Sequence, residues 1–587
     1  MMDVLLVNGM DLSGTEAVTA HIGQHILKSI LEPEFETKII SFDDLVRKKE
    51  FDIGDDPEKL IGKMADLILS QGTPVVGFYT ICNTFHLVVR VSEVVKKRAP
   101  ETFIFYGGPH ATLTSKKCME TFNFLDLICL GESERSILPL MREIFGKREF
   151  DAVPGIVYRN NGTIKENPCA ALLSDDELTK YTQYRLGNVA EFKNMRVTME
   201  GGRGCPFECS FCSTSRFWKR KFRVKPADVL VKEMDKYFEL YGQTDFAIQH
   251  DMFTANRKHI TSFCNYLIEK GSPYVWRCSS RTDVLDKDLI ELMKKAGCLE
   301  IYTGIETGSD RMQRITHKNL KLENAVETIR WITEAGIKSI VSFIYGYPDE
   351  TVDDFYQTLS MIRKIYLIGS IDIQLHKFFP LPATEEGDKV VGRAYFDADT
   401  VDLSIFNRNV CSEKTLDLIK KNKELFLQFY DFKSDVRTDF PYIEAMIMFL
   451  SSLEGAFPLT LREIIGRCDL LAFYRHNEEM FGVIFNSYRS TQSVMKLRGE
   501  FIENLGKIAH EQVERGISFL YDFEKTVMEF KRSSDREPVM LDMEFDISQY
   551  IKSKCFVWEN TRVLLSIDNE TMDIKIKKIP SWIVFKN

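Results

Sequence analysis

The 587-residue sequence lacks several features that mark whole classes of protein. It has no uninterrupted apolar run long enough to span a bilayer, because the most apolar long segment, Tyr442–Leu461, is broken by two glutamates and by Pro458. The first residues lack the basic region and cleavage site of a secretory signal. The thirteen cysteines show no disulfide-like spacing. We therefore expect a cytoplasmic protein without a transmembrane segment.

Positive charge is not in excess either. The formal net charge is −9, which argues against a broad nucleic-acid-binding surface. The strongest basic and aromatic run, Arg216–Arg223, has the composition that cradles phosphates and stacks bases, or that of a solvated loop. We expect the solvated loop and no nucleic-acid partner. The length predicts roughly three to four domains.

Three of the cysteines lie within eight residues of one another, behind a glycine-rich turn. Cys205, Cys209 and Cys212 belong to the stretch Gly201–Ser213. Intracellular thiolates this close bind a metal centre or carry out redox chemistry, and three of them leave one position of a four-iron cluster free. The alternative is a chance triple of small buried side chains.

The C-x3-C-x2-C spacing resembles the signature of the radical S-adenosylmethionine (SAM) superfamily. That resemblance implies a [4Fe-4S] cluster on the three cysteines, with the fourth iron chelating the methionine amine and carboxylate of SAM. It also implies that Phe211, between the last two cysteines, faces the adenine of SAM.

From residue 3 to about residue 150, apolar strand-like runs alternate with helical patterns. Continuous Val, Ile, Leu and Phe are typical of strands buried on both faces of a parallel sheet. The runs lie at Val4–Asn8, Thr37–Ser41, Val75–Thr80, Phe103–Tyr106 and Leu125–Leu130, with helices such as Thr15–Leu31 and Leu87–Lys97 between them. Five such units predict a flavodoxin-like doubly wound domain over residues 1–150, whose ligand site lies beyond the carboxyl ends of the strands.

The residues that follow these strands resemble those of the cobalamin-binding domain that precedes many radical SAM modules, in class B methylases and in anaerobic protoporphyrin-ester cyclases. The resemblance implies cobalamin contacts at Asn8, Gly9, Thr80, Gly107, Gly108, His110, Gly131 and Glu132. No Asp-x-His-x-x-Gly motif occurs, and neither His86 nor His110 fits one. We therefore expect cobalt without a histidine ligand. An empty domain kept for architecture is the alternative.

Residues 151–194 are interpreted as a linker that includes a hairpin with a tight Asn161-Gly162 turn. Six strand–helix repeats follow over residues 195–382 and predict a parallel barrel or part of one. Their strands are expected at Met195–Glu200, Asp245–Gln249, Val275–Ser279, Glu300–Gly304, Ser339–Tyr345 and Asp372–Phe379. A helix is expected to start at Pro226. Six units match the partial (β/α)6 barrel of the radical SAM superfamily.

Polar groups at the ends of these strands suit SAM, which needs a cation for its carboxylate and acceptors for its amine and ribose hydroxyls. By resemblance, Arg281 holds the carboxylate, Glu306 the ribose or amine, and the segment around Gly346 the adenine, while Asp251 supplies a further acceptor. His250 stands where relatives commonly have an acid, and is a candidate catalytic or cobalamin-facing residue. The alternative for Arg281 and Glu306 is a structural salt bridge at the barrel rim.

The remaining chain predicts a mainly helical region over residues 383–537 and a small β-rich segment over residues 538–587. Helices are expected at Glu413–Tyr430, Tyr442–Leu453, Leu461–Tyr474 and Leu497–Lys531, and strands at Thr561–Ile567 and Thr571–Ile579 around a turn at Asp568–Glu570. The region contains no second cysteine cluster, so we expect a single iron–sulfur centre.

Together these features predict an α/β enzyme that uses a [4Fe-4S] cluster, SAM and cobalamin to form a 5′-deoxyadenosyl radical and modify an unactivated carbon. The resemblance implies C-methylation of a peptide or small molecule, with flavodoxin or ferredoxin as external electron donor. Cyclisation, ring contraction or oxidation without methyl transfer is the first alternative. A non-catalytic cobalamin or iron–sulfur sensor is the second. The sequence does not identify the substrate.

Overall fold

The computed structural model describes residues 2–8, 22–160, 162–181, 196–369, 371–396, 411–491, 494–511, 515–532, 539–543, 561–567 and 574–579. The chain forms two compact units. The first contains Met1–Thr358 and His376–Phe440, and the second contains Leu359–Leu375 and Pro441–Asn587. The predicted α/β class is confirmed, while the predicted domain boundaries at residues 150, 194 and 382 stay predictions.

The first unit begins with a seven-stranded sheet in the order β2-β1-β3-β4-β5-β6-β7. Its parallel strands are β1 (Val4–Asn8), β2 (Thr37–Ser41), β3 (Val75–Tyr79), β4 (Phe103–Gly107) and β5 (Leu127–Cys129), close to the predicted bounds. The hairpin expected in the linker forms β6 (Ile156–Asn160) and β7 (Thr163–Glu166) and extends this sheet antiparallel to β5. The first three residues of β6, Ile156, Val157 and Tyr158, are buried, which explains why this strand joins the sheet.

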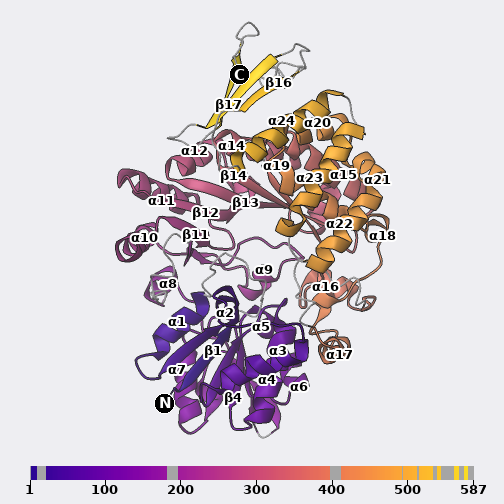
Figure 1. Ribbon diagram of the computed structural model, residues 1–587. Coiled ribbons are helices and arrows are strands. Elements are labelled where there is room, and N and C mark those ends of the chain that lie inside the picture. The colour runs from indigo at the N-terminus through magenta and orange to yellow at the C-terminus, as the bar shows by residue number, and fades with distance from the viewer. Residues whose placement is uncertain are drawn as a thin grey trace. The chain divides into compact units, whose positions relative to one another are not determined.

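Successive residues of the parallel strands supply two separate cores, because their side chains point to opposite faces. Leu5 and Val7 pack with the helices α3 (Pro57–Leu69) and α4 (Phe85–Arg98), whereas Val4 and Leu6 pack with α1 (Ile22–Leu31) and α7 (Ile137–Phe145). Figure 1 shows these two pairs of helices on opposite faces of the sheet. The predicted helix at Thr15–Leu31 is described only from Ile22 onward.

A second, six-stranded sheet has the order β15-β14-β13-β12-β11-β8, so each strand lies beside the next one in the chain. The strands are β8 (Val197–Glu200), β11 (Asp245–Gln249), β12 (Val275–Ser280), β13 (Cys298–Glu306), β14 (Lys338–Tyr345) and β15 (Asp372–Lys377). The helices between them are α10 (Ala227–Tyr241), α11 (Arg257–Glu269), α12 (Lys287–Lys295), α14 (Leu322–Glu334) and α15 (Val352–Tyr366). Pro226 caps α10 from the preceding position. The parallel strands from β8 to β14 bring their carboxyl ends to one edge.

Short helices connect the larger elements of the first unit. They are α2 (Phe42–Arg47), α5 (Pro109–Leu113), α6 (Ser115–Thr121), α8 (Asp175–Tyr181), α9 (Ser213–Phe217), α13 (Asp310–Ile315), α16 (Glu385–Val390), α17 (Glu413–Lys421) and α18 (Asp435–Asp439). The helix predicted at Glu413–Tyr430 ends at Lys421. Beyond it, Leu425 and Phe426 turn inward to the core around α3 and α4, which breaks the helical path.

The second unit is mainly helical and ends in a small sheet. Its helices are α19 (Ile443–Glu454), α20 (Pro458–Arg467), α21 (Leu470–His476), α22 (Glu478–Thr491), α23 (Val494–Glu511) and α24 (Arg515–Arg532). The strands β16 (Val539–Met543), β17 (Thr561–Ile567) and β18 (Ile574–Ile579) pair antiparallel. The turn predicted at Asp568–Glu570 lies outside the described residues. No helix in the described ranges is both long and apolar enough to cross a bilayer.

Two of the helices predicted in this unit are each divided in two. The predicted helix Leu461–Tyr474 breaks at Cys468, which is extended, and Asp469 then caps α21 by accepting the Ala472 amide. The predicted helix Leu497–Lys531 is divided into α23 and α24. The sequence pattern did not predict α22 at all, although its first turn carries two glutamates.

Two buried histidines, in the helices α4 and α5, make the stability of the protein depend on pH. Burial lowers the pKa of His86 to about 3 and that of His110 to about 3. The unfolded chain therefore binds protons that the folded chain does not, so stability is full above about pH 6.5 and falls as the pH drops toward the folded pKa. Both ring nitrogens of His86 lack a hydrogen-bond partner in the described part of the chain.

We therefore expect His86→Leu to remove part of this acid sensitivity. The effect of one such histidine at pH 5 is about 2 kcal/mol. Urea unfolding at pH 7.5 and pH 5 measures it, and the variant should lose less stability between the two than the wild type. A control, His476→Ala, changes an exposed histidine and should leave the pH difference unchanged. Equal pH differences in wild type and His86→Leu would contradict the prediction.

Candidate active site

The cysteine loop leaves the end of β8 and is closed at its base by a short antiparallel ladder. The strands β9 (Gly202–Arg203) and β10 (Arg223–Val224) pair Arg203 with Arg223. Gly204 has a φ of 87°, and a Cβ there would lie 1.9 Å from the Lys221 carbonyl oxygen. Only glycine therefore allows the two ends of the loop to approach this closely.

The three cysteines of this loop line one cavity of about 410 Å³. Burial raises the pKa of Cys205 to about 11, and it also raises the pKa of Cys209, against the opposing effect of Lys318 and Arg281. No three His, Cys, Asp or Glu side chains in the described ranges converge as a single metal ion would require. Three thiols on one cavity wall, with cations beside Cys209, fit a cluster that leaves one iron open.

Arg281 directly follows β12 and is held by several contacts within the chain. Its Nε and Nη2 atoms donate to Asp283, and Nη2 also donates to the Lys318 carbonyl at 2.7 Å. Its guanidinium lies 3.8 Å from the centroid of the Phe207 ring, and Nη1 lies 3.8 Å from Cys209 Sγ. Burial disfavours its charge, but Asp283 outweighs this and raises the pKa of Arg281.

Glu306 and Lys318 form a buried ion pair on the wall of the same cavity. Lys318 Nζ lies 3.1 Å from Glu306 Oε1. Glu306 sits at a bulge near the end of β13 with a φ of 70°, a strained conformation for a residue with a side chain. Sequence reasoning predicted Glu306 but missed Lys318, because Lys318 lies in the loop before α14 and not directly after a strand.

Asp251 lies on the wall of the cavity, where it fastens the cysteine loop. Its carboxylate accepts the Gly204 amide at 3.0 Å and the side-chain donors of Trp218 and Thr214. Burial raises the pKa of Asp251, and these hydrogen bonds oppose the rise.

His250 has both ring nitrogens bonded to backbone. Nδ1 accepts the Met252 amide at 2.8 Å, so Nε2 carries the proton and donates to the Arg223 carbonyl at 3.0 Å. Burial lowers the pKa of His250 to about 4, which keeps the ring neutral. These bonds occupy both nitrogens that its predicted catalytic role would use, and they give His250 a place in supporting the base of the cysteine loop.

Of Phe211 and Gly346, only Phe211 lines the smaller cavity. Phe211 lines the cavity and packs edge-on against Tyr347, with ring centroids 5.8 Å apart. Gly346 lines neither of the two cavities described here; its amide donates to Glu350, and its carbonyl accepts Arg437 Nε at 2.9 Å. Burial raises the pKa of Glu350 to about 8.

A second cavity, of about 710 Å³, lies at the carboxyl edge of the first sheet. Of the residues predicted there, Gly107, Gly108, Gly131 and Glu132 line it. A Cβ at Gly131 would meet nothing within 4 Å, so its backbone is open to close approach. Thr80 lies beneath the edge, where its hydroxyl donates to the Gly107 carbonyl at 2.8 Å.

Asn8 and His110, which were also predicted for this edge, do not line the cavity. Asn8 and His110 are buried, and His110 packs against Phe85 with ring centroids 4.1 Å apart. Gly9 lies outside the described residues.

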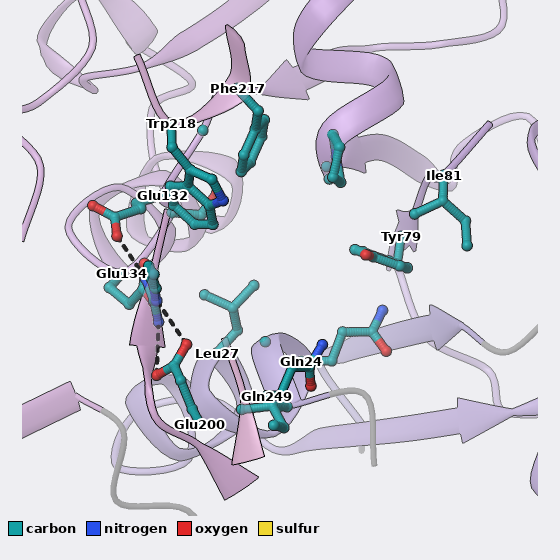
Figure 2. A pocket seen from close by; sticks show the side chains of 18 of the residues that line it. Gln24, Leu27, Tyr79, Ile81, Glu132, Glu134, Glu200, Phe217, Trp218 and Gln249 are labelled. Carbon is teal, nitrogen blue, oxygen red and sulfur yellow. Dashed lines mark hydrogen bonds and ion pairs between the residues drawn. The ribbon is translucent and has the colours of Figure 1, made fainter. Parts of the chain in front are cut away.

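Residues of both sheets contribute walls to the larger cavity, including residues that sequence reasoning missed. Figure 2 shows Glu132, Glu134 and Glu200 on one side and Tyr79 and Ile81 on the other, with Phe217, Trp218 and Gln249 also on the walls. The aromatic pair Phe217-Trp218 belongs to the basic run at Arg216–Arg223. That basic run is the one feature of the sequence that could have pointed to this aromatic pair.

The two cavities share one wall, at the carboxyl end of β11. Ile248, Gln249, His250 and Asp251 line both. The end of a single strand therefore separates the space beside the three cysteines from the space at the edge of the first sheet.

The geometry around His250 predicts a cost in stability when its ring is removed. His250→Ala leaves the buried Met252 amide and Arg223 carbonyl without their partners, which should lower the free energy of unfolding by about 2 to 4 kcal/mol. Urea unfolding at pH 7.5 measures this. His476→Ala, at an exposed position, is the control and should change stability by less than about 0.5 kcal/mol. If His250→Ala unfolds at the same urea concentration as the wild type, the His250 ring does not support the base of the cysteine loop.

Comparison with known proteins finds similarity over parts of this chain. Residues 199–362 match the family model described as the radical SAM superfamily. An uncharacterised methyltransferase of Pyrococcus horikoshii is 26% identical over 372 residues, covering 62% of this chain and 78% of that protein. The anaerobic magnesium-protoporphyrin IX monomethyl ester cyclase of Cereibacter sphaeroides is 27% identical over 314 residues, covering 51% of this chain and 50% of the cyclase. The chain thus spans about half the length of this relative.

Solved structures share the fold. The radical SAM methyltransferase TsrM from Kitasatospora setae, solved with tryptophan and a SAM analogue, matches with a TM-score of 0.59 and 14% identity, over 76% of this chain and 88% of TsrM. The cobalamin-dependent SAM radical enzyme OxsB, solved with aqua-cobalamin and SAM, matches with a TM-score of 0.53 and 15% identity, over 91% of this chain and 80% of OxsB. At this level of identity the likeness shows the fold alone.

Proposed function

On the premise that this chain is a radical SAM enzyme, we propose that it is cobalamin-dependent and transfers a methyl group to an unactivated carbon of a peptide or small molecule. We further propose that its six-stranded sheet is a partial barrel and that it works in the cytoplasm with flavodoxin or ferredoxin as electron donor. The relatives support this reading, because TsrM is a methyltransferase in name and OxsB is cobalamin-dependent in name.

One observation carries the proposal: the two cavities share the wall at the end of β11. A radical made at the cluster is too reactive to travel, so the substrate carbon and the methyl donor must lie within reach of the same small space. A cavity beside the three cysteines and a larger one across a single strand end provide that arrangement. The larger cavity has apolar and aromatic walls and open glycine backbone, which suit a broad, flat macrocycle with polar amides at its rim.

The side chains of the smaller cavity suit SAM by charge and position. Cys205, Cys209 and Cys212 would hold the cluster, and Arg281 with Lys318 would receive the carboxylate of SAM. Glu306 would accept hydrogen bonds from the amine or the ribose, and Phe211 would lie beside the adenine. When bound, the cluster supplies the electron that cleaves SAM, and cobalamin supplies a methyl carrier. The chain supplies fixed distances and a site from which bulk water is excluded.

A second function is favoured by one comparison. The similarity to the magnesium-protoporphyrin ester cyclase supports the same cofactors used for cyclisation, ring contraction or oxidation without methyl transfer. The sensor alternative gives no role to the two cations Arg281 and Lys318 beside Cys209, and the structure therefore favours an enzyme.

The cluster assignment predicts that each of Cys205→Ala, Cys209→Ala and Cys212→Ala loses most of the bound iron. Removing one of three thiolate ligands leaves two irons without a protein ligand in place of one. Iron and sulfide analysis after anaerobic reconstitution, together with the visible absorbance of the cluster, measures the loss. Cys169→Ala, at an exposed cysteine outside the loop, is the matched control and should bind iron like the wild type. Full iron content in any of the three loop variants would remove that cysteine from the ligand set.

The function itself is tested in two measurements. The reconstituted wild type should retain about one cobalt per chain after incubation with hydroxocobalamin and gel filtration. The enzyme is then incubated with reductant, with SAM that carries a trideuterated methyl group, and with a metabolite and peptide extract of the host. Mass spectrometry should detect a product that is heavier by one labelled methyl group. Retained cobalt with a desaturated or cyclised, unlabelled product would support the second function. Absence of stoichiometric cobalt would overturn the cobalamin assignment.

A further inference from the structure

A cluster of five buried charges joins the edge of the first sheet to the base of the cysteine loop. We call it the charge clasp. It consists of Glu132 and Glu134, from the loop after β5, and Glu200, Arg203 and Arg223, from the two ends of the cysteine-loop base. Their side chains are between 5% and 12% exposed. Such a cluster costs free energy to bury, so its position calls for an explanation.

Arg203 uses each of its three nitrogens for a different carboxylate. Nη1 lies 2.8 Å from Glu132, Nη2 lies 2.6 Å from Glu134, and Nε lies 2.7 Å from Glu200. Burial disfavours the charge of Arg203, but Glu200 and Glu134 outweigh it and raise its pKa well above the usual value. A planar fork of five N–H donors satisfies three acceptors in this way, whereas the single ammonium group of a lysine cannot match its geometry.

Arg223 fastens the other end of the loop base to the same carboxylate. Its Nη1 lies 2.6 Å from Glu132 Oε1 and also donates to the Leu173 carbonyl at 3.0 Å. Glu132 is thus shared by the residues on both strands of the ladder that closes the cysteine loop. The loop cannot shift against the first sheet unless these contacts break.

Trp218 links the clasp to the wall between the cavities. The Arg223 guanidinium lies 5.3 Å from the centroid of a Trp218 ring and that of Arg203 lies 6.0 Å away. The same side chain donates to Asp251, which accepts the Gly204 amide one residue before Cys205. Glu132, Glu134, Glu200 and Arg203 also line the larger cavity. Figure 2 shows the three glutamates on the side opposite Tyr79. One set of contacts therefore fixes a cavity wall and the cysteine loop together.

We propose that Arg203 and Arg223 are positioning residues that lock the cobalamin cavity against the cysteine loop and so set the distance between cobalt and cluster. The part that concerns the two cofactors rests on the proposed function. The mechanical part concerns only this chain: the segments 126–136 and 199–224 open together.

The cofactor distance is tested by pulsed electron paramagnetic resonance on anaerobically reconstituted enzyme in which the cluster is reduced and cobalamin is Co(II). The wild type should show one defined spin–spin interaction between the two centres. Arg203→Gln should keep wild-type iron and cobalt content but lose or broaden this interaction. Arg220→Gln is the matched control, because Arg220 lies on the same loop and pairs with Glu208 at the surface, where the two side chains are 61% and 51% exposed. An interaction in Arg203→Gln identical to the wild type would overturn the proposal.

A further measurement and a second variant distinguish a positioning role of Arg203 from a merely structural one. Hydrogen–deuterium exchange of the apoprotein should be at least about tenfold faster in Arg203→Gln within both segments and unchanged elsewhere. Faster exchange in only one segment, or across the whole chain, would show a merely structural role and overturn the proposal. If Arg203→Gln does not fold, Glu134→Gln tests the proposal in its place. This variant keeps the bonds of Arg203 to Glu132 and Glu200, so it should show a weaker form of both effects: the altered spin–spin interaction and the faster exchange in both segments. Failure of the wild type to bind cobalamin would contradict the proposed function. The exchange experiment on the apoprotein would still test the charge clasp.

Discussion

The closed base of the cysteine loop is the constraint on which the rest of the site depends. Cys205, Cys209 and Cys212 can face one cavity only if the chain returns sharply from β8, and that return needs backbone contact so close that Gly204 admits no side chain. Short ladders of two residues have little stability of their own. The ladder of β9 and β10 is held by side chains: the charge clasp on one side and His250 on the other, through its bond to the Arg223 carbonyl.

The secondary structure was largely predictable because the signals for it are local. Continuous apolar runs predicted the buried parallel strands, and their bounds at Val4–Asn8 and Asp245–Gln249 agree with the structure. Helix ends were less predictable, since a cap such as Asp469 acts only when a neighbouring residue turns extended. The hairpin β6 and β7 was recognised as a hairpin, but its pairing with β5 depends on a contact that no local pattern carries.

The candidate site was predictable where it follows strand ends and unpredictable where it depends on contacts distant in sequence. Arg281 and Glu306 were found because the ends of parallel strands meet at one edge. Lys318 was missed because it follows a helix. The clasp was missed because Arg203, in β9, and Glu132, in the loop after β5, lie 71 residues apart. Asp251 was predicted to bind SAM. It lines the expected cavity, and its observed partners are the Gly204 amide and the Trp218 and Thr214 side chains.

The histidine at position 250 follows from the charge balance of the clasp. Three carboxylates face two guanidinium groups there, so the buried cluster already carries one excess negative charge. An ionised acid at position 250 would add a second negative charge and could not donate to the Arg223 carbonyl. A neutral imidazole adds no charge, donates through Nε2 and accepts the Met252 amide through Nδ1. A neutral histidine therefore suits this position better than an ionised acid.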